Sequence, residues 1–167
     1  AALCVATGTV AQPAYNYSKL QKEQLGRGVV AIRENPSDVV VSWRYLSSDP
    51  INTSFNVYRN GEKIAEVPHS TGTFYRDTYS GNEKAVYTVK PVINGVETGK
   101  LNGNYTLPAN APSGYIDIPL DRPAEGVTPS GQKYTYSPND ASIGDVDGDG
   151  EYEIILKWDP SNAHDNA

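Results

Sequence analysis

Alternation of apolar and polar residues is the clearest pattern in the first two thirds of the chain. In the segment VVVSWRY (39–45), Val39, Val41, Trp43 and Tyr45 fall on one face of an extended backbone. Side chains on alternate positions of a strand share a face, so this pattern predicts a strand with one face on a core.

Two Asn-Gly dipeptides predict tight hairpin turns. The first, Asn60-Gly61, lies within the segment 55–67. The second, Asn94-Gly95, lies within the segment 85–97. Asn and Gly tolerate the positive φ that a type I′ turn requires at both central positions. A further alternating run, TFYRDT, occupies 73–78. Short strands at intervals of about ten residues favour an antiparallel β-sandwich.

The composition agrees with a soluble, β-rich protein. The 167 residues are 38% hydrophobic and 20% charged, and they include 15 Gly, 12 Pro and 12 Tyr against two Phe. So many turn-forming Gly and Pro residues, together with many tyrosines, which suit partly exposed strand positions, favour strands over long helices. The formal net charge is −6. Nucleic acids and membrane surfaces are polyanionic, so we expect neither as a partner.

The acidity is concentrated near the end of the sequence. Residues 139–167 hold eight acidic residues and one lysine. Within them, DVDGDGEYE (145–153) places carboxylates at alternate positions of a tight loop, Gly150 permits a sharp reversal, and the seventh position can offer its carbonyl. An oxygen-only set favours Ca²⁺ over zinc or copper. The sequence therefore predicts a calcium site, with a solvated acidic turn as the alternative, and the candidate ligands are Asp145, Asp147, Asp149, Glu151 and Glu153.

The residues after this loop decide its class. An EF-hand needs a carboxylate at loop position twelve and a helix beyond it, but position twelve is Leu156 and EIILKW (153–158) has the character of a strand. Loops of the form DxDxDG that precede a strand are typical of β-propeller blades. We expect this strand to be buried.

The first part of the chain resembles a fibronectin type III module. The likeness rests on Trp43 in an early strand, on FNVYRNG (55–61), and on Tyr87 and Val89 in a later strand. It implies that the Tyr87 hydroxyl ties a loop back to the sheet. We expect Trp43, Tyr58 and Tyr87 to pack in a core, the alternative being a surface that stacks on carbohydrate.

The run YSPNDASIGDVDGDGEYEIILKWDPSNAHDN (136–166) closely resembles the family-11 rhamnogalacturonan lyases, and the likeness extends upstream through LGRGVVAI, VVVSWR and FNVYRNG. It implies a small N-terminal β-domain followed by a propeller of roughly eight blades. The expected fold is all-β. A fibronectin type III-like sandwich at 15–107 is followed, through the linker-like 107–115, by the start of a calcium-binding propeller at 113–167.

The resemblance implies a secreted enzyme that cuts the rhamnose–galacturonate backbone of pectin, rhamnogalacturonan I, by β-elimination. A base removes the C5 proton of galacturonate, whose carboxylate is neutralised, and the O4 linkage leaves. The catalytic Arg and Lys of the family would lie beyond residue 167, so we expect no catalytic residue here and no activity from this chain alone. Asn139 and Asp159 match substrate contacts of the family, although each could instead only shape a turn.

The sequence is also compatible with two other functions. A non-catalytic, calcium-binding module that binds carbohydrate would show the same first part, and an adhesion propeller would share the DxDxDG loop. We expect the protein to be a monomer, and we expect His69 and His164 to lie at the surface.

The uncharged, small and apolar segment AALCVATGTVA (1–11) predicts the remnant of a secretory signal. The mature chain would then lack cysteine, which fits a secreted or periplasmic protein stabilised by its core and a metal. A buried strand and a lipid anchor at Cys4 are the alternatives.

Overall fold

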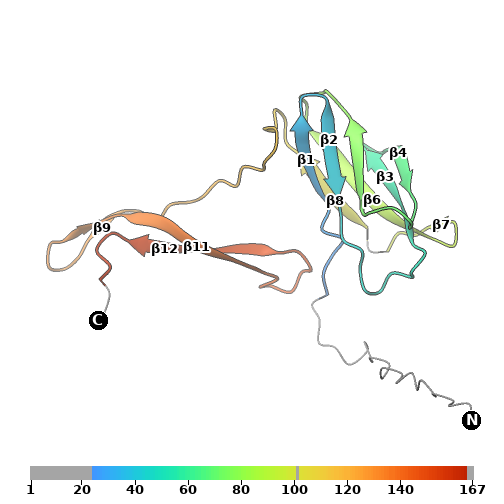
Figure 1. The fold of residues 1–167 in the computed structure, drawn as a ribbon. Helices are drawn as coiled ribbons and strands as arrows, with labels where there is room; N and C mark the ends of the chain where they lie inside the picture. The colour runs from blue at the N-terminus through green and yellow to red at the C-terminus, as the bar shows by residue number, and fades with distance from the viewer. Residues whose placement is uncertain (1–23, 101, 165–167) are drawn as a thin grey trace, which may run out of the picture.

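The protein is all-β in a computed structural model that describes residues 24–100 and 102–164 (Figure 1). No helix among these residues could cross a membrane. The predicted signal remnant at 1–11 and its Cys4 lie outside the described residues. The described strands form two units, a pair of facing sheets and a separate pair of hairpins (Figure 1).

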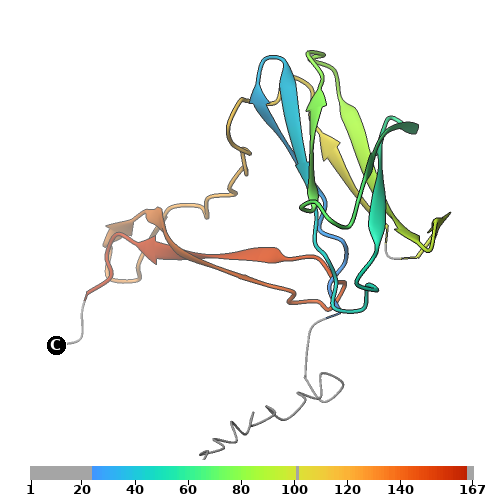
Figure 2. The same cartoon turned by 45° about the vertical axis from the view of Figure 1, so that its right-hand side comes forward.

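The first unit consists of two antiparallel sheets. One sheet has the order β1 (Val30–Asn35), β2 (Asp38–Ser42), β5 (Phe74–Thr78). The other has the order β4 (Glu62–Val67), β3 (Ser54–Arg59), β6 (Ala85–Ile93), β7 (Val96–Glu97), and β8 (Gly103–Leu107) also pairs with β6. Figure 2 shows the two sheets face to face.

Both sheets contribute to one hydrophobic core, whose buried members are Val29, Ala31, Val39, Val41, Trp43, Phe55, Val57, Val67, Ala85, Tyr87, Val89 and Leu107. The predicted core positions Trp43 and Tyr87 are confirmed. The prediction that Tyr58 packs in the core was wrong, because it follows the buried Val57 on β3 and so faces the other side of the sheet. There its hydroxyl donates to the Glu97 carboxylate, and the Lys90 ammonium lies 4.6 Å from its ring centroid. Burial of the alternate strand positions is the main force that holds the sheets together.

The predicted strand at 39–45 is shorter than the sequence pattern indicates. It ends at Ser42, and Tyr45 is 42% exposed, so its placement in the core was wrong. The Arg44 amide donates to the Arg27 carbonyl at 2.8 Å, which takes the chain out of the ladder with β5 before Tyr45. The Tyr45 ring still meets the edge of Phe55 at 6.0 Å between centroids.

Both predicted Asn-Gly hairpins are confirmed. Asn60 and Gly61 have φ of 51° and 86° between β3 and β4, and Asn94 and Gly95 have φ of 52° and 78° between β6 and β7. These left-handed backbones are the ones that Asn and Gly adopt with least strain.

The Tyr87 hydroxyl does not tie a loop to the sheet, so that expectation was wrong. It donates instead to Asp77 Oδ2 at 2.8 Å, on strand β5 of the opposite sheet. The Arg59 guanidinium also reaches that oxygen, at 2.6 Å. A buried carboxylate needs donors, and Tyr87 and Arg59 supply them across the core. Burial, reinforced by the hydrogen bond to Asp77, raises the pKa of Tyr87 well above its ordinary value.

The second unit contains two hairpins. Strands β9 (Gly126–Val127) and β10 (Lys133–Tyr134) form a short one, and β11 (Tyr136–Gly144) and β12 (Glu153–Pro160) form a long one. The prediction that EIILKW is buried was wrong, since Ile154 and Ile155 are 49% and 48% exposed. The physical reason is that β11 and β12 form a sheet of only two strands, over which the described residues place no second layer (Figure 1).

Candidate functional site

Three carboxylates gather in the turn between β11 and β12. Asp145, Asp147 and Asp149 each offer one oxygen, and these oxygens all lie within 4.8 Å of one another. A calcium ion holds its ligands at about 2.3–2.6 Å, so two ligands of one ion are at most roughly 5 Å apart. The spacing and the oxygen-only chemistry of this group therefore fit a calcium ion.

Backbone amides of the same turn fix these carboxylates. Asp145 accepts hydrogen bonds from the amides of Gly148 and Gly150, at 2.8 and 3.1 Å. The amides at 149 and 151 donate to Asp147 and Asp149, at 3.1 and 2.8 Å. Positive φ at Gly148 (79°) and Gly150 (93°) folds the chain back so that these donors face inward.

No lysine or arginine in the described part of the chain balances the negative charge of the three carboxylates through an ion pair. Backbone amides carry only partial positive charge, so three adjacent carboxylates repel one another. A bound divalent cation would remove that repulsion.

The two predicted glutamate ligands lie outside this group of three. Glu153 Oε2 accepts a hydrogen bond from the Val146 amide at 2.7 Å and thereby closes the base of the turn. Glu151 faces the first unit, and a Cβ placed on Gly26 would be 2.6 Å from its Oε1.

The structure brings the predicted substrate contacts Asn139 and Asp159 together. The Asn139 amide donates to Asp159 Oδ2 across the β11–β12 hairpin. The register of the hairpin shifts between Pro138 and Ala141, and this irregularity releases Asn139 from regular pairing. Bulges of this kind commonly redirect side chains near functional sites.

Lys157 joins Asn139 and Asp159 in a polar cluster, and the sequence analysis did not identify Lys157 as part of a site. Its ammonium lies 2.9 Å from Asp159 Oδ1, and its side chain is 64% exposed. The Lys157 ammonium and then the Asn139 amide lower the pKa of Asp159, and Asp159 in turn raises the pKa of Lys157. The signal was present in the sequence, because residues two apart on a strand share a face.

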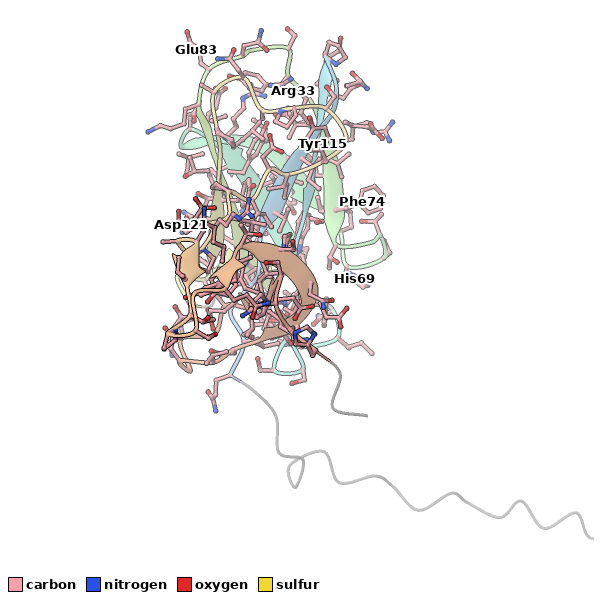
Figure 3. All side chains as sticks on the ribbon, turned by 90° about the vertical axis from the view of Figure 1, so that its left-hand side faces the viewer. Arg33, His69, Phe74, Glu83, Tyr115 and Asp121 are labelled. Carbon is pink, nitrogen blue, oxygen red and sulfur yellow. The ribbon has the colours of Figure 1, made fainter. Side chains whose placement is uncertain are left out.

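The two histidines lie at the surface, as predicted. Both are exposed, and Figure 3 shows His69 at the periphery of the first unit. Neither belongs to the carboxylate group or to the polar cluster.

Comparisons with known proteins match both units of the fold. The family described as rhamnogalacturonan I lyases, beta-sheet domain, matches residues 20–105, more than half of the chain. The chain belongs to the rhamnogalacturonan lyases. The C-terminal domain of rhamnogalacturonan lyase family 11 matches residues 115–167. The family resemblance read from the motifs is therefore confirmed.

Two curated relatives of this lyase-family chain come from Bacillus subtilis (strain 168). The rhamnogalacturonan endolyase YesW is 47% identical over 149 residues, covering 88% of this chain and 23% of YesW. The rhamnogalacturonan exolyase YesX is 45% identical over 149 residues, covering 89% of this chain and 23% of YesX. The chain thus spans less than a quarter of the length of either relative.

A solved structure supports the same assignment. The crystal structure of exotype rhamnogalacturonan lyase YesX matches with a TM-score of 0.70 at 45% identity, over 88% of this chain and 23% of that one. The all-β fold expected from the sequence is confirmed.

Proposed function

We propose that this chain is part of a secreted lyase that cleaves the backbone of rhamnogalacturonan I by β-elimination. The observation that carries the proposal is the 47% and 45% identity to an endolyase and an exolyase, which extends over 149 residues and so includes both units. The small, apolar and uncharged segment at 1–11 supports export.

We also propose that the turn at 145–153 binds calcium. The group of three carboxylates and their amide donors support this, as described above. The ion would hold the two strands of the hairpin at a fixed separation. It would thereby steady the two strands that carry Asn139 and Asp159.

For the fold, we propose a fibronectin type III-like sandwich at 15–107 and the start of a propeller at 113–167. Two antiparallel sheets around one core support the first assignment. The long hairpin supports the second, because the exposed side chains of Ile143, Ile154 and Ile155 provide apolar surface that packed blades would cover.

The polar cluster is suited to holding a sugar chain. Asp159 can accept hydrogen bonds from sugar hydroxyls, and Asn139 can both donate and accept. The lowered pKa of Asp159 makes its carboxylate a weak base. Proton abstraction at C5 needs a stronger one, so we assign this cluster to binding, and the catalytic groups to residues outside this chain.

A calcium-binding module without catalysis is the second candidate function. The exposed cluster and the acidic turn fit it equally well, because neither requires a reaction. The test is a chimera in which this chain replaces the matching segment of the endolyase YesW.

Unsaturated uronide absorbs in the ultraviolet, so absorbance reports β-elimination on rhamnogalacturonan I. We expect the chimera to be active and the 167-residue chain alone to give no signal. A chimera that is folded and loaded with calcium but inactive would favour the non-catalytic module. Activity from the chain alone would overturn the assignment of the catalytic groups.

A further inference from the structure

The acidic turn contacts the first unit directly, backbone against backbone. The Gly26 amide donates to the Gly150 carbonyl at 2.6 Å. A Cβ on Gly150 would lie 2.7 Å from the Gln24 carbonyl oxygen and 3.0 Å from the Gly26 nitrogen. Gly150 is also the buried residue of a turn whose other members are exposed or half-buried. A side chain at position 150 would therefore collide with the backbone of the first unit, and glycine permits this close approach.

Arg44 reinforces this contact from the first unit. Its Nη1 donates to the Gly26 carbonyl at 3.2 Å, and its guanidinium carbon lies 4.6 Å from the centroid of the Tyr152 ring. A Cβ on Gly28, which has φ of +54°, would lie 2.6 Å from that same guanidinium carbon. Arg44 thus occupies the space between the Gly28 backbone and Tyr152, where a cation over an aromatic face is attractive.

The segment that receives the turn is fixed to the interior of the first unit. Arg27 lies between the two glycines in the sequence and is fully buried. Its guanidinium binds both carboxylate oxygens of Asp49, at 2.5 and 3.0 Å, and donates to the Arg44 carbonyl at 3.0 Å. The backbone of Gly26 and Gly28 is therefore held in place independently of the acidic turn.

The backbone of a single residue of the turn, Gly150, bonds both to the first unit and to a candidate ligand. The Gly150 amide donates to Asp145 Oδ2 at 3.1 Å, while the Gly150 carbonyl accepts from Gly26. The docking of Gly150 consequently sets where the Asp145 carboxylate lies. Figure 2 shows the tip of the long hairpin beside the base of the two facing sheets.

We infer that Gly26, Gly28 and Arg44 are positioning residues of the calcium site, and that the first unit controls the affinity of the turn for the ion. This inference rests on the calcium binding proposed above. Because coupling between two sites is reciprocal, bound calcium must also stabilise the docked turn.

The first test is calorimetric titration of the full chain with Ca²⁺ alone. Loss of one cation–aromatic contact and one hydrogen bond predicts about two- to thirtyfold weaker binding for Arg44→Ala, with the stoichiometry unchanged. Tyr152→Leu removes the same contact from the turn and should weaken binding similarly. Arg76→Ala is the matched control, because Arg76 is an exposed arginine that pairs with Glu34 on the first sheet.

Hydrogen exchange at the Gly26 amide tests the docking without any metal. We expect protection in the wild type and in Arg76→Ala, and faster exchange in Arg44→Ala and Tyr152→Leu. A wild type that binds no calcium but protects Gly26 would overturn the calcium site and the coupling while leaving the docking intact. Unchanged calcium affinity in both variants would overturn the inference and leave the calcium site standing. If Arg44→Ala fails to fold, the calcium affinity and the Gly26 exchange rate of Tyr152→Leu test the inference instead.

Discussion

Arg27 and Asp49 form a bidentate ion pair in the interior of the first unit, with nitrogen–oxygen distances of 2.5 and 3.0 Å. Their side chains are 0% and 3% exposed. Asp49 Oδ2 also accepts the Leu46 amide at 2.7 Å. The pair therefore links the segment that receives the acidic turn to the loop after β2.

Breaking this pair on one side should strongly destabilise the protein. Arg27→Met leaves the Asp49 carboxylate buried without its counter-charge, which costs roughly 3–5 kcal/mol of the free energy of unfolding. Urea denaturation measures the loss. Arg76→Met at the exposed pair with Glu34 is the control and should cost at most about 1 kcal/mol. Equal effects of the two substitutions would contradict the role given to burial.

Glu97 should make the first unit sensitive to acid. Hydrogen bonds from Tyr58, Asn56 and Lys90 lower the pKa of Glu97 from 4.5 to about 2. A carboxylate with a depressed folded pKa stabilises the fold fully above its unfolded pKa, and that contribution is lost as the pH falls through the folded pKa. Stability should therefore decline between about pH 4.5 and pH 2.

The measurement for Glu97 is the urea midpoint as a function of pH. Glu97→Gln should be less stable at neutral pH and should show a flatter profile in that window. Glu66→Gln is the control, because Glu66 pairs with Lys63 at the exposed surface. If Glu97→Gln has the same pH profile as the wild type, the hydrogen bonds to Glu97 contribute nothing to the acid sensitivity of the fold.

Calcium should raise the melting temperature of the chain, and chelation should lower it. A ligand that binds only the folded state stabilises it by about 2.7 kcal/mol at a free concentration of a hundred times Kd. Asp147→Ala should lose one calcium in calorimetric titration and should melt at the same temperature with or without the ion. Asp121→Ala is the control, since Asp121 is exposed and distant from the turn in sequence. Equal calcium stoichiometry in Asp147→Ala and the wild type would overturn the assignment of a calcium site to this turn.

In the chimera with YesW, Asp159→Asn should weaken turnover while the fold and the calcium content stay intact. A hydrogen bond to a charged group contributes about 1.5–3 kcal/mol, which corresponds to roughly ten- to a hundredfold in kcat/KM. Steady-state kinetics and the melting temperature should be measured on one preparation. Normal kinetics with reduced stability would instead assign Asp159 a structural role at the end of β12.

Several features of this protein could be predicted from the sequence because they depend on residues that are close together along the chain. The Asn60 and Asn94 turns were predictable because few residues adopt the required positive φ. Burial of Val39 and Val41 was predictable from the period of a strand. The convergence of the acidic turn followed from its alternate spacing, and family membership followed from motifs that the comparisons confirm.

Only the tertiary structure decided which distant residues meet. Tyr87 bonds to Asp77 on the other sheet, Gly26 bonds to Gly150 across the two units, and Asn139 bonds to Asp159 across a hairpin whose register shifts. The sequence also could not predict that Ile154 is 49% exposed. An alternating pattern fixes which side chains of a strand share a face, but what covers that face depends on how remote segments pack.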